Sequence, residues 1–157
     1  MDKLLLRLSE TVGILFLIAF IIFVSGDEKI STSDPEELSA SIISVTDTEG
    51  LSERNEIFLK KQFSVNPEEL DYFCYFSSDS VMDVREYLIV KADKKVLQSL
   101  EESISSVLEE KQTLFRDYAP EQSALLDSGV LIYEKGYLLY AVGEDSDAVL
   151  SEFRDNL

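Results

Sequence analysis

The chain has 157 residues and a formal net charge of −17, with no histidine and one cysteine. Such an acidic surface repels phosphate backbones, which argues against nucleic-acid binding. The missing histidine excludes Ser-His-Asp and Cys-His catalysis as well as histidine metal ligation. The single cysteine, Cys74, cannot form an internal disulfide, and its aromatic surroundings predict a buried core thiol.

An uninterrupted apolar run extends from Thr11 to Val24 near the N-terminus. It predicts a membrane anchor over residues 1–26 that contacts the membrane through Thr11 to Val24, although it is slightly short for a bilayer core. A cleaved signal peptide ending near Gly26 is a second interpretation, and a buried helix of a soluble protein is a third. Because Lys3 and Arg7 precede the run, the N-terminus is expected in the cytoplasm and the acidic domain outside, or secreted if the leader is cleaved.

The remaining sequence predicts a polar tether over residues 27–35 and one domain over residues 36–157. A helix capped by Asp34 is expected first, followed by a short helix over residues 54–62 and two strands over 72–77 and 84–92. A long amphipathic helix follows, capped by Asp93 and ending at Pro120. Its apolar face is expected to include Leu114 and Tyr118.

A short helix, a hairpin over residues 130–142 with Gly136 in its turn, and a last helix complete the chain. This order predicts an α+β fold. The domain is expected to have two layers, a four-stranded antiparallel sheet with helices packed on it, preceded by the N-terminal apolar helix.

Three residues are candidates for ligand binding. Glu86 is the only charge in an apolar strand, so a buried position requires a partner such as Lys91 or Arg116. A structural salt bridge and a ligand-binding carboxylate are both consistent with that position. Tyr133 and Tyr137 flank the hairpin turn, either as cross-strand packing or as an aromatic surface for a peptide or glycan.

No catalytic residue, metal site or cofactor is predicted. The acidic segments around Asp79 and Asp83, and from Glu144 to Asp147, do not match the twelve-residue calcium loop. A helix cap and a solvated turn explain these segments better.

Four segments together resemble a known family. They are Val65–Tyr72 (VNPEELDY), Asp83–Ala92 (DVREYLIVKA), Gln112–Glu121 (QTLFRDYAPE) and the turn Lys135-Gly136-Tyr137. In this order and spacing, residues 36–155 resemble bacterial proteins of domain of unknown function 4358. The resemblance implies a small exported or membrane-anchored protein. Many members are lipoproteins, but no cysteine directly follows the apolar run here. The resemblance implies no activity.

The sequence therefore favours a non-enzymatic, membrane-tethered extracytoplasmic domain that binds an envelope protein, peptide or glycan. A carboxylate-dependent hydrolase acting on cell-envelope glycan or peptide is the alternative, and it requires two carboxyl groups facing each other in a cleft.

Overall fold

The structure is a computed structural model that describes residues 30–157. The predicted anchor from Thr11 to Val24 lies outside the described residues. In chain order the elements are α2 (Pro35–Ser44), β1 (Leu51–Glu53), α3 (Glu56–Phe63), the 3-10 helix η1 (Pro67–Glu69), β2 (Leu70–Ser78), β3 (Glu86–Ala92), α4 (Lys94–Phe115), α5 (Pro120–Asp127), β4 (Val130–Glu134), β5 (Tyr137–Val142) and α6 (Ser146–Asn156). Within the described part of the chain, no helix is long and apolar enough to cross a membrane.

The strands form one antiparallel sheet in the order β1-β2-β3-β5-β4. The α+β class is confirmed, but the expected number of four strands is wrong, because β1 forms a fifth strand at the edge. β1 has only three residues, too few for alternation to be recognised in a sequence. Gly50 precedes it with φ +77°, a backbone conformation that favours glycine.

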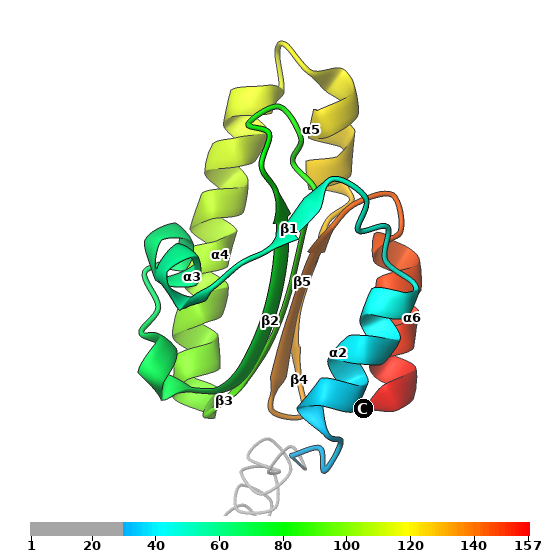
Figure 1. Ribbon diagram of the computed structural model, residues 1–157. Helices are drawn as coiled ribbons and strands as arrows, with labels where there is room; N and C mark the ends of the chain where they lie inside the picture. The colour runs from blue at the N-terminus through cyan, green and yellow to red at the C-terminus, as the bar shows by residue number, and fades with distance from the viewer. Residues whose placement is uncertain (1–29) are drawn as a thin grey trace, which may run out of the picture.

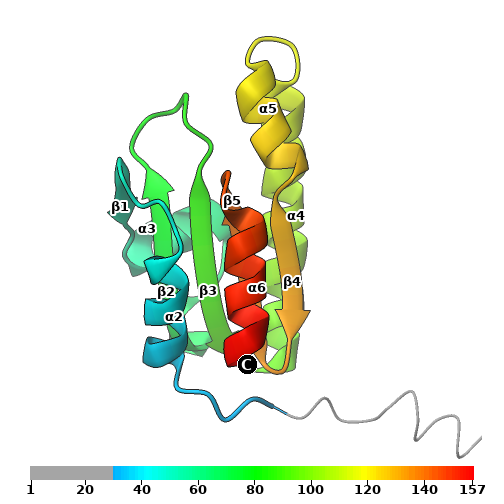
Figure 2. The same cartoon turned by 90° about the vertical axis from the view of Figure 1, so that its right-hand side faces the viewer.

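Helices cover both faces of the sheet, so the expected two-layer arrangement is also wrong. In Figures 1 and 2, α3, α4 and α5 lie on one side of the sheet, and α2 and α6 lie on the other. Leu88 and Val90 of β3 belong to the first core, whereas Tyr87 and Ile89 belong to the second. A strand buried on both faces is apolar at nearly every position, and β3 and β5 fit that pattern.

The structure agrees only in part with the helix caps and helix faces that the sequence predicts. The Asp34 carboxylate accepts hydrogen bonds from the N–H groups of Glu36 (2.9 Å) and Glu37 (3.1 Å), as expected for an N-cap. Asp93 occupies the N-cap position of α4 but makes no capping hydrogen bond with its side chain. The predicted apolar face of α4 is too long, because Leu114 is exposed and the helix ends at Phe115, before Pro120, which leaves the exposed Tyr118 beyond its end.

The first described residues are held against the C-terminus. Ser31 donates its N–H to the Lys135 carbonyl (2.8 Å) and its hydroxyl to the Leu157 carbonyl (3.0 Å). The Ser33 hydroxyl donates to the carbonyl of Asn156 (2.7 Å). The chain therefore enters the domain beside the β4–β5 turn and the end of α6, at the opposite end from the α4–α5 connection (Figure 1).

Candidate functional site

A buried charged cluster lies between the sheet and α4. Glu86, at the start of β3, is 2% exposed and forms an ion pair with Lys111 of α4 (Nζ to Oε2, 2.5 Å). The Tyr75 hydroxyl of β2 donates a hydrogen bond to the other carboxylate oxygen. The carboxylate thus has both a counter-charge and a hydrogen-bond donor, which is what a buried charge requires.

The predicted partners of Glu86 are wrong. Side chains alternate along a strand, so Lys91 lies on the opposite face, where its Nζ is 5.1 Å from the centre of the Tyr137 ring. Arg116 follows the last residue of α4 and is exposed. Helical spacing contains a signal for the true partner, because Lys111 follows the buried Ile104 by seven residues, two turns of the same face.

Two tyrosine hydroxyls stay un-ionised around this carboxylate. Burial and the negative charge of Glu86 raise the pKa of Tyr75 far above its ordinary value. The same two causes raise the pKa of Tyr140, whose buried hydroxyl makes no hydrogen bond of ordinary geometry to a described residue. The cluster therefore combines one ion pair with two un-ionised tyrosine hydroxyls.

A cleft of about 430 Å³, lined in part by Glu86 and Lys111, opens beside the cluster between residues 77–85 and the end of α4. Arg54 follows β1 and crosses this cleft. It forms an ion pair with Asp79 (2.8 Å), donates to the Ser77 hydroxyl (2.7 Å), and lies over the Phe58 ring at 4.5 Å from its centre. The exposed side chains of Val81 and Leu114 line the cleft.

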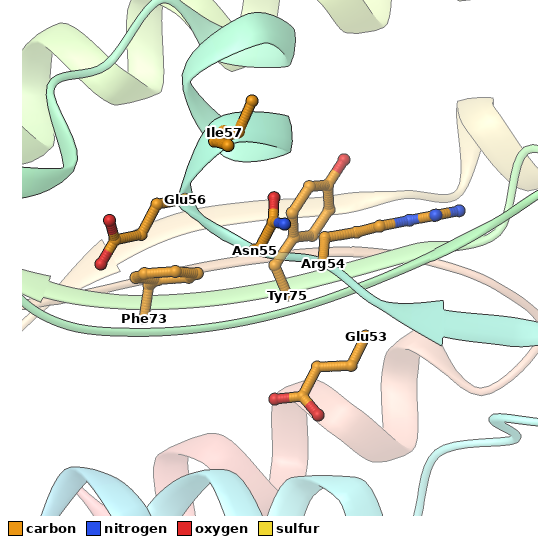
Figure 3. Close-up of a pocket in the computed structure, with 7 residues that line it drawn as sticks. All are labelled: Glu53, Arg54, Asn55, Glu56, Ile57, Phe73 and Tyr75. Atoms are coloured by element: carbon orange, nitrogen blue, oxygen red, sulfur yellow. The ribbon is translucent and has the colours of Figure 1, made fainter.

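Arg54 and Tyr75 also line a second hollow, of about 500 Å³, at the edge of the sheet (Figure 3). Its other lining residues are Glu53, Asn55, Glu56, Ile57 and Phe73. The hollow forms where the chain turns away from β2 after β1 and enters α3. Figure 3 shows Glu56 beside the Phe73 ring, with the Arg54 guanidinium pointing away from it. Sequence reasoning missed this site because its residues come from three separate elements.

The carboxylates that line the cleft beside α4 are each paired with a cation. Asp79 pairs with Arg54, Glu86 with Lys111, and Asp83 with Arg85 (2.8 Å). Burial acts to raise the pKa of Asp83, but the hydrogen bonds and charge of Arg85 outweigh burial and lower it. Within residues 30–157 no group of three or more acidic or cysteine side chains is placed to hold a metal ion.

The three predicted ligand-binding residues do not come together. Glu86 faces α4, and Tyr133 packs partly buried against the core on that same face. Tyr137 is fully buried on the opposite face, and its hydroxyl donates to the Ser33 carbonyl (2.7 Å). The hairpin tyrosines therefore do not share one surface.

Cys74 is a buried free thiol, and burial raises its pKa to about 11.

Comparison with known proteins places the chain by family. A family model described as a domain of unknown function (DUF4358) matches residues 44–143, from the end of α2 to the end of β5, which is more than half of the chain. Neither a search of curated proteins nor a search of solved structures found a significant match. The protein belongs to the DUF4358 family.

Proposed function

We propose that this protein is a non-enzymatic binding module and that its N-terminal segment tethers it to the outer face of a cell membrane. The observation that carries the proposal is the hollow at the edge of the sheet, where an open strand edge, an aromatic ring and carboxylates lie together (Figure 3). Concave sites with a few placed polar groups are typical of ligand binding.

The way the chain enters the domain is consistent with a tether. The hydrogen bonds that Ser31 and Ser33 donate hold residues 31–33 at the end of the domain that carries the β4–β5 turn. With the apolar run in the membrane, that end faces the bilayer, and the end with the α4–α5 connection faces away (Figure 1). The edge of β2 then runs between the two ends and remains accessible.

The hydrolase alternative receives less support. A two-carboxylate hydrolase needs two carboxyl groups roughly 5–10 Å apart, one of which acts as an acid. The three carboxylates of the cleft beside α4, Asp79, Asp83 and Glu86, are each held by a cation. Pairing with a cation favours the ionised form of a carboxylate, whereas a general acid must hold its proton.

Site-specific crosslinking in intact cells tests the binding function. A photoreactive amino acid replaces Ile57, which is 78% exposed and lines the hollow, in the full chain. The matched control carries it at Glu110, an exposed position of α4 outside the hollow. We expect a discrete crosslinked species from position 57 and none from position 110. Equal crosslinking at both positions, or none at either, would overturn the binding function.

The same cells test the tether. We expect the full chain in the membrane fraction, with the domain digested by protease added outside intact cells. N-terminal sequencing of the recovered protein distinguishes an intact Met1 end, which supports the anchor, from a start at Asp27, which indicates cleavage. A domain protected in intact cells would contradict the proposed location.

A further inference from the structure

The outer edge of β2 is open below β1. β1 pairs with β2 only from the residue pair Leu51–Ser78 to the pair Glu53–Phe76. Directly after this pairing, the Arg54 N–H donates a hydrogen bond to the Tyr75 carbonyl (2.7 Å). No other described strand lies on this side of β2. Figure 1 shows the open stretch between α3 and α2, with β1 crossing above it.

Strand geometry identifies the backbone groups at this edge. The N–H and C=O of one residue point to the same side of a strand, and that side alternates along the chain. Because the Tyr75 carbonyl faces β1, the N–H and C=O of Phe73 also face outward. An extended segment can therefore continue the sheet here by bonding to Phe73, as in strand addition.

Carboxylates lie on both faces of the sheet beside this edge. Glu56 lies beside the Phe73 ring, on the α3 side (Figure 3). Glu53 lies on the opposite face, because its register partner Phe76 alternates with Tyr75, and Figure 3 shows its side chain pointing away from Glu56. Glu53, Glu56 and Asp71 are exposed. Successive side chains of an added strand point to opposite faces, so two adjacent basic residues would meet one carboxylate each.

We propose that the open edge of β2 binds an extended, basic peptide segment of a partner protein as an added strand. The backbone of that segment pairs with Phe73, one basic side chain meets Glu56 over the Phe73 ring, and the next meets Glu53. The assignment rests on the proposed binding function and names its partner class. A second copy of this chain is disfavoured as the occupant, because its charge of −17 repels an equally acidic surface.

The outer edge of β4 also has no neighbouring strand among the described residues. The two edges differ in their surroundings. Among the hollows of the described residues, the one lined by Phe73 and two glutamates lies beside β2. Binding at β4 would be unaffected by changes at Glu53 and Glu56, which separates the two sites experimentally.

Direct binding to the full chain in neutral detergent tests the assignment. The probe is a short fluorescent peptide with two adjacent lysines flanked by valine and threonine, measured by anisotropy at low salt. We expect binding that E53Q/E56Q weakens about fivefold, the effect of two exposed ion pairs. The control E101Q/E102Q makes the same charge change on α4 and should leave the affinity within about twofold.

Two further probes test the strand geometry. Methylation of the backbone amides of the lysine peptide removes its backbone hydrogen-bond donors, and we expect this change to weaken binding about tenfold or more. A probe with glutamates in place of the lysines should not bind. The assignment is overturned if the methylated or acidic probe binds equally well, or if both double variants weaken binding alike. If crosslinking at position 57 succeeds while the basic probe fails, the binding function stands and the partner class is wrong.

Discussion

Removing the cation from the buried cluster is the sharpest test of the structure. The K111M substitution removes the ammonium group that lies 2.5 Å from the Glu86 carboxylate, and Glu86 is only 2% exposed in the wild type. Only the Tyr75 hydroxyl still donates to it. We expect the free energy of unfolding to fall, because an unpaired charge in the interior lacks both water and a counter-ion.

The size of the effect follows from the exposure of the two partners. Breaking a fully buried ion pair by removing one partner costs about 3–5 kcal/mol. The Lys111 side chain is 25% exposed, so water already reaches one side of the pair and screens it. We therefore expect K111M to lose about 2–3 kcal/mol.

Urea unfolding of the full chain in non-ionic detergent measures this loss. The chain has no tryptophan and seven tyrosines, so the near-ultraviolet circular dichroism of tyrosine reports the packed state. The exposed Lys95, also on α4, provides the control K95M, expected within about 0.5 kcal/mol of the wild type. The double variant E86Q/K111M should recover at least half of the loss, because no charge remains and the amide oxygen still accepts from Tyr75.

Two results would refute this reasoning. One is a K111M variant no less stable than K95M, which would mean that Glu86 does not depend on its cation. The other is a double variant as unstable as K111M. In that case lost packing of the lysine side chain, and not an uncompensated charge, would account for the effect.

Three further predictions concern other parts of the domain. Burial raises the pKa of Cys74 from 9.0 to about 11. Near pH 8 a disulfide reagent should therefore react about 100-fold more slowly with the folded chain than with the unfolded chain. Equal rates would contradict the burial of this thiol. In G143A the added methyl group collides with the Tyr87 hydroxyl, and urea unfolding should show a loss of about 1–3 kcal/mol. The double variant G143A/Y87F should recover part of that loss, and no recovery would argue against the collision. The pKa of Asp83 is lowered, so its pairing with Arg85 stabilises the fold above the ordinary value of 3.8 and is lost as the pH falls through the folded pKa. D83N should therefore be less stable than the wild type by about 1 kcal/mol at pH 7, and this deficit should shrink as the pH falls below 3.8, whereas a deficit unchanged by pH would contradict the pairing.

The local elements of this protein could be predicted from the sequence because their signals lie within one segment. The Asp34 cap precedes Pro35, and it forms as expected. The apolar positions of α4 recur at helical spacing, and the β4–β5 hairpin turns at Gly136, where φ is +88°. Each depends on residues a few positions apart, so neighbours in the chain determine it.

The layers of the fold depended on tertiary structure. The β3 sequence alternates between two apolar sets, one containing Leu88 and the other Tyr87, and alternation alone does not say that helices cover both sets. β1 is a strand only because Leu51 to Glu53 lie beside β2. A three-residue segment carries too little periodicity to be recognised without that neighbour.

From the sequence alone, Glu86 is expected to need a partner if it is buried, because a charge within an apolar strand cannot be buried alone. The packing of α4 on the sheet makes Lys111, 25 positions away, that partner. The pairing of β1 with β2 brings Glu53, Glu56 and Phe73 to one open edge. Charge, burial and strand alternation are properties of a segment, and a sequence displays them. Which segments meet depends on how helices and strands far apart in the chain pack, and only the folded domain specifies that.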